Sequence, residues 1–410
     1  MNNPSNPSSP SPAVLRMSQP WEMIDALMGG TETMRAAGPR FLPKNTAEPS
    51  EAYQRRLAAS FLFNGYRRAI ETLSGKPFSQ PLQLGDDVPE LLVEYAKDID
   101  LQGRNLHAFA HDVFRTALSH GLSHILVDHP KVPTLPDGKS HTLADQRAAG
   151  RPYFVHLHPD AMLGWRSERI NGVETLTQLR FLETIEEPDP VNEWATKEIK
   201  QVRVIEPNAW RIYRKGQDDK WYVADEGEMS IGVIPLATVY GQRTGFMTAR
   251  PPLLDLAWLN VEHWQSASDQ SNILHVARVP ILFASGFEST DPITVGAGIA
   301  VTTDDPNANL RYVEHQGAAI EAGRQSLKDL EERMSLLGGL LLTQKPGMKT
   351  ATEKAIETAE AESSLGLMAL NLQDALDLAL DYAAKWEGII TGGGTVKVFT
   401  DFGKADAGGV

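Results

Sequence analysis

The residues best suited to chemistry in this sequence are histidines between positions 107 and 158. His107 and His111 stand four residues apart, so a helix would place both imidazoles on one face, as many metal sites do. Such sites also need a carboxylate in a frame such as H-E-x-x-H, and the nearby Asp112 and Asp128 form no such frame. We therefore predict packing or surface histidines and no metal ligand. A metal-dependent hydrolase built on residues 107–158 is the alternative function.

Motifs for other catalytic chemistry are missing from the sequence. There is no cysteine, which excludes disulfides, thiolate metal sites and thiol catalysis. No phosphate-binding G-x-x-x-x-G-K-[ST] loop and no G-x-S-x-G nucleophile elbow occur. Gly296-Ala297-Gly298 lacks the third glycine of a dinucleotide site. We predict a protein that is not an enzyme, with no catalytic residues and no cofactor.

Composition narrows the class of protein further. The 410 residues include 39 Lys+Arg and 53 Asp+Glu, for a net charge of −14. This balance argues against a protein that wraps nucleic acid through many phosphate contacts, because such proteins are basic. No apolar run reaches the ~20 residues of a membrane span, and the first residues do not read as a signal peptide. We expect a globular protein made in a cytoplasm-like setting, with no membrane partner.

Helical periodicity dominates the first part of the chain. Residues 1–18 are rich in Pro, Ser and Asn and predict a disordered tail. Ser50 is expected to cap a helix that continues through Ile70 to Gly75. A second helix is predicted over Leu106–Leu118, with Gly121 ending it.

The pattern then changes to short segments of β-branched and aromatic residues separated by turns. Asn171-Gly172 predicts a tight hairpin turn between Trp165–Ile170 and Val173–Phe181. The predicted strands are Ile125–Val127, Tyr153–Leu157, Leu176–Ile185, Val202–Ile205, Ala209–Tyr213, Trp221–Val223 and Ile234–Tyr240. We expect an α+β fold with a mostly antiparallel sheet.

Two long helices with a β-rich insert between them are predicted next. The second has a narrow apolar stripe, which favours helix–helix contact with a neighbouring subunit. The Gly-rich loop 338–350 follows, carrying Lys345 and Lys349 in an otherwise acidic chain. It is either an ordinary exposed loop or a basic element offered to a polyanion. Thr350 and Glu353 form a capping box that starts the longest helix, and Thr395–Phe399 predicts a last strand.

Four segments in this order resemble the portal proteins of tailed bacteriophages, in particular a subfamily catalogued as a phage domain of unknown function. They are YQRRLAASFLFNGYRRAIETLSGKPF at 53–78, the stretch 100–127 with its IDLQGRNLHAFA start, PPLLDLAWLNVEHWQSASDQSNIL at 251–274 and KTATEKAIETAEAESS at 349–364. The resemblance covers most of residues 20–390. It implies a homo-oligomeric ring at one capsid vertex, and the usual assembly of the family is a dodecamer.

The resemblance also divides the chain into parts. It implies a wing, two stem helices, a clip, a DNA-approaching tunnel loop, and a long helix towards a short crown. The boundaries are 1–18 for the disordered tail, 19–251 for the wing (helical 19–121, mainly β 122–251), 252–277 and 317–337 for the stem helices, 278–316 for the clip, 338–350 for the tunnel loop, 351–388 for the long wing/crown helix and 389–410 for the C-terminal segment.

Function and site residues follow from the same resemblance. A portal passes double-stranded DNA during packaging and ejection, and it docks the terminase large subunit, the head–tail adaptor and the major capsid protein. The expected location is the virion, after assembly in the host cytoplasm. The DNA-proximal residues would be Gln344, Lys345 and Lys349, and the residues packing between subunits would be Trp258, Val261, Trp264, Leu327, Leu330 and Met334. A smaller head–tail adaptor is a further option, disfavoured by the chain length.

Overall fold

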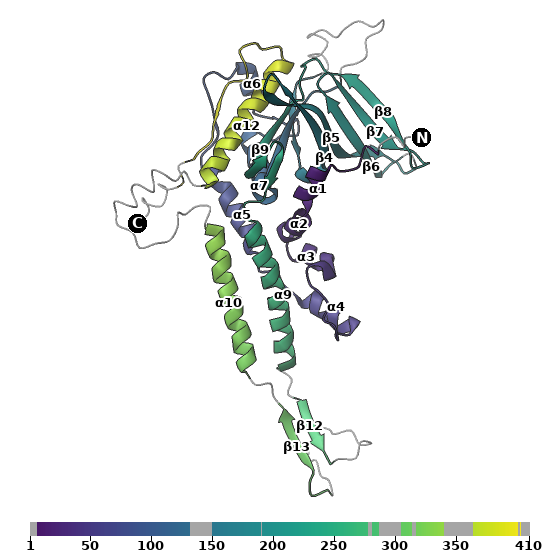
Figure 1. Cartoon of the computed structure of the whole chain (residues 1–410), viewed down its shortest axis with the longest axis vertical. Coiled ribbons are helices and arrows are strands. Elements are labelled where there is room, and N and C mark those ends of the chain that lie inside the picture. The colour runs from purple at the N-terminus through teal and green to yellow at the C-terminus, as the bar shows by residue number, and fades with distance from the viewer. Residues whose placement is uncertain are drawn as a thin grey trace, which may run out of the picture. The chain divides into compact units, whose positions relative to one another are not determined.

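The computed structural model describes residues 6–131, 150–189, 191–277, 281–286, 305–313, 317–339, 364–400 and 402. The chain forms two compact units. The first comprises residues 1–28, 66–257 and 337–410, and the second comprises residues 29–65 and 258–336. Both contain helices and antiparallel strands, so the predicted α+β class is confirmed (Figure 1).

A three-stranded antiparallel sheet in the order β3-β2-β9 forms the core of the first unit. Its central strand β2 (Leu122–Asp128) is buried along its whole length, between β3 (Tyr153–Leu157) and β9 (Leu236–Tyr240). The helices α7 (Leu106–His120) and α12 (Ser364–Trp386) both contact β2 and β9. This packing covers both faces of β2, so even its polar residues Ser123 and His124 are buried.

Helix α7 begins and ends where capping chemistry requires. The side chain of Asn105 accepts a hydrogen bond from the Ala108 amide at 2.9 Å, which satisfies one of the free amides at the helix start. Gly121 has φ of 97°, a left-handed conformation that glycine adopts without a steric penalty. The predicted helix is therefore confirmed, and it places His120 at its last turn.

The first unit also contains a five-stranded antiparallel sheet in the order β4-β5-β6-β7-β8. Asn171 and Gly172 have φ of 51° and 84°, as a type I′ turn requires, and Ile170 pairs with Val173. The predicted hairpin is thus confirmed in position and register. The strand bounds are Met162–Ile170, Val173–Pro188, Thr196–Glu206, Ala209–Lys215 and Trp221–Glu228.

The predicted disordered tail is wrong for its last residues. Helix α1 spans Pro12–Ser18 and is capped by Ser11, whose amide also donates to the Leu163 carbonyl at 2.7 Å. The Arg180 guanidinium donates to the Pro7 carbonyl at 2.7 Å. Composition suggested disorder because the segment has few apolar residues, but backbone hydrogen bonds and buried Val14 hold it against the sheet.

The second unit is built around two long helices. Helix α9 (Leu254–Ala277) begins in the first unit and continues into the second, and α10 (Ala318–Gly339) returns along it. Between them in sequence, β12 (Ile281–Ser285) and β13 (Asn309–Val313) pair as an antiparallel hairpin. The shorter elements of this unit are α3 (Thr31–Ala37), η1 (Gly38–Arg40) and α4 (Ser50–Ala59).

The single helix expected from Ser50 to Gly75 is wrong, because the structure has two helices there. Helix α4 ends at Ala59, and α5 (Gly65–Gly75) begins after a non-helical stretch. In that stretch Leu62 is buried while Phe61 is exposed, the alternation of an extended chain. The apolar residues recur at helical spacing across this stretch, so the sequence pattern predicts one continuous helix and does not indicate the break. The Ser50 side chain does not cap α4, whose N-cap residue is Pro49.

The remaining described elements are short. They are α2 (Trp21–Gly29), η2 (Lys76–Phe78), β1 (Gln83–Leu84), α6 (Glu90–Tyr95), η4 (Pro159–Ala161), β10 (Gln242–Gly245), β11 (Thr248–Arg250) and β14 (Val396–Lys397). Strand β14 is the core of the predicted last strand. The predicted loop 338–350 starts inside α10, and residues 340–363, with the predicted capping box, lie outside the described residues.

Candidate functional site

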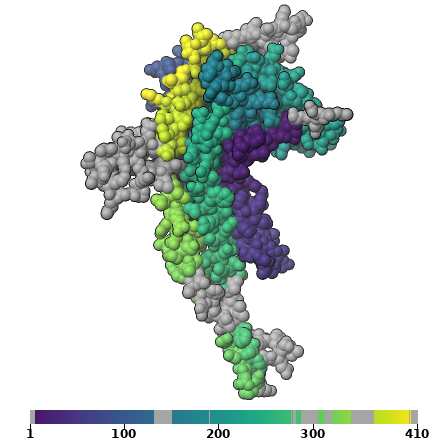
Figure 2. All heavy atoms as spheres, in the orientation of Figure 1, coloured from purple at the N-terminus to yellow at the C-terminus, as the bar shows by residue number. Residues whose placement is uncertain are grey.

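Helices α9 and α10 of the second unit pack as an antiparallel pair (Figures 1 and 2). His263 Nε2 lies 3.3 Å from Glu331 Oε1, and Gln270 Nε2 donates to the Ile320 carbonyl at 2.9 Å. The contact on α10 thus shifts back from Glu331 to Ile320 as the position on α9 advances from His263 to Gln270, which shows that the two helices are antiparallel. At the Gln270 crossing α10 has Gly323, where a Cβ would lie 2.1 Å from Gln270 Oε1. Because glycine has no side chain, it leaves room there for the end of the Gln270 side chain.

Polar side chains of α9 also fix residues 29–65 of the same unit. Asn260 donates to the Phe63 carbonyl at 2.9 Å, and Gln265 donates to the Phe41 carbonyl at 3.0 Å. Asn260 is fully buried, so its hydrogen bond replaces one that water would have made. The α9 sequence looked amphipathic, but some of its buried positions are polar because they hold neighbouring backbone in place.

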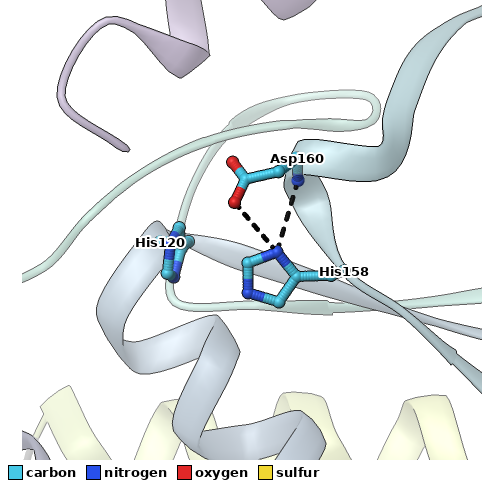
Figure 3. Close-up of side chains that lie close together, drawn as sticks. All are labelled: His120, His158 and Asp160. Atoms are coloured by element: carbon cyan, nitrogen blue, oxygen red, sulfur yellow. Dashed lines mark hydrogen bonds and ion pairs between the residues drawn. The ribbon is translucent and has the colours of Figure 1, made fainter. Parts of the chain in front are cut away.

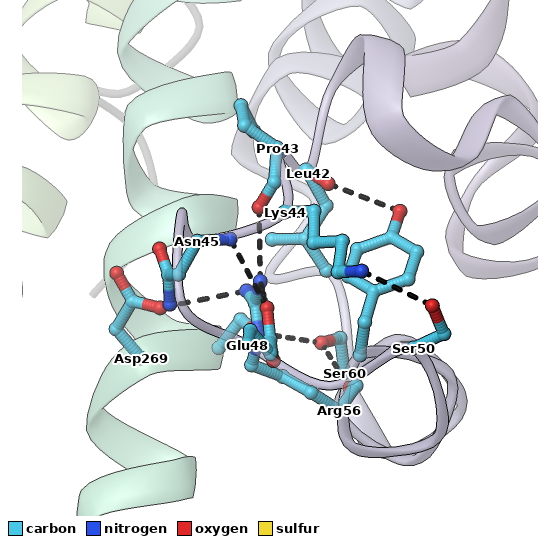
Figure 4. Close-up of polar contacts among 11 residues, drawn as sticks. Leu42, Pro43, Lys44, Asn45, Glu48, Ser50, Arg56, Ser60 and Asp269 are labelled. Carbon is cyan, nitrogen blue, oxygen red and sulfur yellow. Dashed lines mark hydrogen bonds and ion pairs between the residues drawn. The ribbon is translucent and has the colours of Figure 1, made fainter.

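Arg56 is the centre of the largest of these polar networks (Figure 4). Its guanidinium makes a bidentate pair with Glu48, with Nε–Oε1 and Nη2–Oε2 distances of 2.8 Å. It also donates to the Pro43 carbonyl at 2.9 Å and lies 3.5 Å from Asp269 of α9. Hydrogen bonding from Arg56 lowers the pKa of the Glu48 carboxyl. The network ties α4 and the loop before it to α9.

Of the residues predicted to pack between subunits, most are already buried in one chain. Val261, Trp264, Leu330 and Met334 each expose 6% or less of their surface. For these four the prediction needs correcting, because the apolar stripe of α10 packs inside the chain. Leu327 is partly buried. Trp258 remains 56% exposed and is the member of the set with most surface to offer a neighbour. Gln344, Lys345 and Lys349 lie outside the described residues.

The histidine pair behind the hydrolase alternative serves packing. The Phe78 ring contacts His107 and His111 edge-on, with centroids 5.3 and 5.1 Å away. His107 Nδ1 also accepts a hydrogen bond from the Leu82 amide at 3.2 Å. Burial lowers the pKa of His111. The two rings flank an aromatic side chain, so the hydrolase alternative is not supported.

Two further histidines lie in the sheet of the first unit, where His124 is buried and His156 is partly buried. Burial, with smaller contributions from the neighbouring histidines, lowers the pKa of His124 to about 3 and that of His156 to about 4. His124 Nδ1 lies 2.9 Å from Thr238 Oγ1, and His156 Nε2 lies 2.8 Å from Ser123 Oγ. Both rings are neutral, hydrogen-bonded core residues, as predicted for the majority of these histidines.

One cluster of ionisable side chains was missed in the sequence. His120, His158 and Asp160 converge at the end of α7 and at η4, and one potential ligand atom from each lies within 4.8 Å of the others (Figure 3). Asp25 of α2 adjoins them, with Oδ1 3.0 Å from His120 Nε2. No spacing signal joins residues so far apart in the chain, so only the fold reveals them.

Comparison with known proteins places part of the chain in a recognised domain. A family model described as "Domain of unknown function (DUF4055)" matches residues 252–387, about a third of the chain. The match extends from α9 to α12. It agrees with the domain-of-unknown-function part of the resemblance noted above. No curated protein matches the sequence.

Among solved structures, the chain is similar to components of gene transfer agent particles. One is from the "Virion of native gene transfer agent (GTA) particle", at 10% identity and a TM-score of 0.44, covering 91% of this chain and 90% of that one. A second, from the "Neck of empty GTA particle computed with C6 symmetry", has 10% identity, a TM-score of 0.43 and coverages of 92% and 90%. A third, from the "Neck of native GTA particle computed with C12 symmetry", has 10% identity, a TM-score of 0.42 and coverages of 82% and 79%.

None of the helices in the described part of the chain combines the length and the apolar content that a membrane crossing needs.

Proposed function

We propose that this chain is a portal subunit of a tailed-phage virion, one copy of a ring through which double-stranded DNA passes. The observation that carries the proposal is the antiparallel pair α9 and α10 joined through the β12–β13 hairpin. This is the order expected of stem, clip and stem. The family match over residues 252–387 spans the same stretch, which supports treating it as one functional part.

Charge supports a channel through which DNA moves freely. Helix α9 contains no lysine or arginine, and its exposed residues include Asp255, Glu262 and Asp269. Side chains that neutralise phosphates hold DNA, and the effect multiplies around a ring. An acidic stem therefore leaves a duplex free to slide. The few lysines at 345 and 349 would supply brief contacts at the narrowest point.

Exposed apolar side chains on the helix pair support assembly. After α9 and α10 have packed together, Trp258 and Leu336 are each still 56% exposed, and Ile273 is 37% exposed. A closed ring covers such surfaces by repeating one heterologous contact around an axis. In the proposed assembly the neighbouring subunit covers Trp258. The same assembly would dock the capsid protein, terminase and head–tail adaptor.

The proposal is tested first by the mass of the purified protein in solution. A chain of 45.0 kDa that forms a ring gives a closed oligomer of fixed copy number, expected to be twelve in the proposed dodecamer. Mass photometry over a range of dilutions measures this directly. Monomers, or a series of oligomers with no fixed copy number, at micromolar concentration would contradict the proposal.

The DNA-proximal assignment needs a separate test. The double variant Lys345→Glu with Lys349→Glu should reduce packaged DNA and its retention in assembled heads, because like charges then face the phosphates. The matched control is Lys328→Glu, which reverses an exposed charge on α10. If the double variant and the control package equally well, the tunnel-loop assignment is wrong although the ring proposal stands.

A further inference from the structure

The histidine–aspartate cluster brings together side chains from three separate parts of the first unit. Asp25 lies on α2, His120 ends α7, and His158 and Asp160 flank the start of η4. His158 Nδ1 lies 3.1 Å from Asp160 Oδ2, and the rings of His120 and His158 stand 4.7 Å apart at 75°. Two imidazoles and two carboxylates therefore meet at one place, and Figure 3 shows His120, His158 and Asp160 of this group.

Both ring nitrogens of His120 have polar neighbours. Ser119 Oγ lies 2.8 Å from Nδ1, and it also donates to the Thr116 carbonyl at 3.1 Å. On the other side of the ring, Nε2 lies 3.0 Å from Asp25 Oδ1. An ion bound beside these two atoms would be within reach of both.

His158 has a similar arrangement. Its Nδ1 lies 3.1 Å from Asp160 Oδ2 and 3.5 Å from the Asp160 amide nitrogen. Both histidines thus place a ring nitrogen about 3 Å from a carboxylate oxygen. Ser119 also fixes the His120 ring from behind, as the oxygen partners of metal-bound histidines do.

We propose that this cluster binds one divalent transition-metal ion through two imidazole nitrogens and two carboxylate oxygens. The ligands are Asp25, His120, His158 and Asp160. Imidazole and carboxylate together suit zinc, and four such ligands complete its tetrahedral coordination. The two carboxylates balance the charge of the ion. Magnesium is disfavoured because it prefers oxygen ligands alone.

The surroundings allow an ion to enter and give it a structural role. His120 is buried, while the His158 and Asp160 side chains are about 40% exposed, so the site is anchored on one side and open to solvent on the other. An ion there would tie α2, the end of α7 and η4 together. Binding to the folded state alone raises stability in proportion to the logarithm of ion concentration. The proposal is independent of ring formation.

The test uses the full chain, freed of any purification tag, stripped with chelator and dialysed. With ZnCl₂ we expect one zinc per chain by calorimetry and elemental analysis, and a higher unfolding temperature; MgCl₂ should cause no such shift. His158→Gln and Asp160→Asn should each weaken zinc binding at least about tenfold. Both side chains are half-exposed, so the variants should fold.

The control variant is His111→Gln, which changes another half-exposed histidine beside an aspartate, Asp112, outside the cluster. It should bind zinc as the parent protein does. The proposal is overturned if the parent takes up no zinc and its unfolding temperature is unchanged, the result expected if only a proton joins His120 to Asp25. It is also overturned if His158→Gln and Asp160→Asn retain full affinity.

Discussion

At the scale of single residues, the Arg56–Glu48 pair shows how a buried charge organises the second unit. The Arg56 side chain is 3% exposed and that of Glu48 is 9% exposed. The guanidinium and the carboxylate nevertheless pair with each other, and the guanidinium also donates to the Pro43 carbonyl. Such a pair need not add stability compared with apolar residues, but removing one half leaves the other charge uncompensated. The pair therefore dictates one arrangement of α4 against α9.

Removing the guanidinium should be costly. We expect Arg56→Met to lower the free energy of unfolding by about 3–5 kcal/mol, because the Glu48 carboxylate then keeps the Asn45 amide as a hydrogen-bond donor but loses its cationic partner. Arg55→Met changes the exposed neighbour and should alter stability by less than about 0.5 kcal/mol. Urea denaturation of both variants measures the difference. Equal effects would show that Arg56 does not hold this network.

A second residue-scale prediction concerns pH. His124 is buried and its pKa falls to about 3 when folded, compared with 6.5 in an unfolded chain; His156 and His158 face it. Below about pH 6.5 the unfolded chain takes up a proton that folded His124 does not, so stability falls as the pH drops towards 3. At pH 5 the loss is about 2 kcal/mol.

The variant His124→Gln isolates this contribution. The difference in unfolding free energy between pH 7 and pH 5 should be about 2 kcal/mol smaller in the variant than in the parent, whatever its absolute stability. Chelator in the buffer removes any contribution from metal. An unchanged pH dependence would mean that His124 is protonated in the folded protein.

At the scale of helices and strands, local turn and cap chemistry made much of the fold predictable. Asn171-Gly172 fixes a hairpin because both residues tolerate positive φ, and Gly121 ends α7 for the same reason. The break at residues 60–64 was not predictable from local pattern. There Leu62 is buried by tertiary contacts, and the helical spacing of neighbouring apolar residues continues across the gap.

The candidate site was predictable in outline and not in detail. Periodicity identified α9 and α10 as a helix pair, because apolar positions recurred along both. It also identified Val261 and Leu330 as buried, but spacing does not reveal whether the burying surface belongs to the same chain. The cluster at His120 and His158 depends wholly on how distant segments pack, so no sequence motif marks it.

The contact between the Gln270 side chain of α9 and Gly323 of α10 gives an element-scale prediction. Gly323→Val should gain helix propensity, yet its side chain collides with Gln270 and displaces the hydrogen bond to the Ile320 carbonyl. We expect a net loss of about 1–3 kcal/mol in unfolding free energy. Ala322→Val, at an exposed position on the same turn, should cost less than about 0.5 kcal/mol. Thermal unfolding compares the two, and a stabilising Gly323→Val would refute this crossing.

At the scale of the whole molecule, the account requires that copies of the chain cover one another's exposed side chains. Trp258→Glu should weaken each contact by about 2 kcal/mol or more, since a buried tryptophan is a common anchor of interfaces. Trp194→Glu changes a tryptophan that is 90% exposed between β5 and β6 and should leave assembly intact. Mass photometry on dilution follows both. Rings of undiminished stability in Trp258→Glu would remove this residue from the interface.

The central claim is that the α9–α10 pair repeats around an axis to line a channel for DNA. Cryo-electron microscopy of the purified assembly tests it most directly. We predict a closed ring whose innermost wall is formed by α9 and α10, with a channel wider than the ~20 Å of a duplex, roughly the two groove depths of B-form DNA plus its base-pair core. A compact single copy, or an oligomer with these helices away from any central opening, would contradict the account.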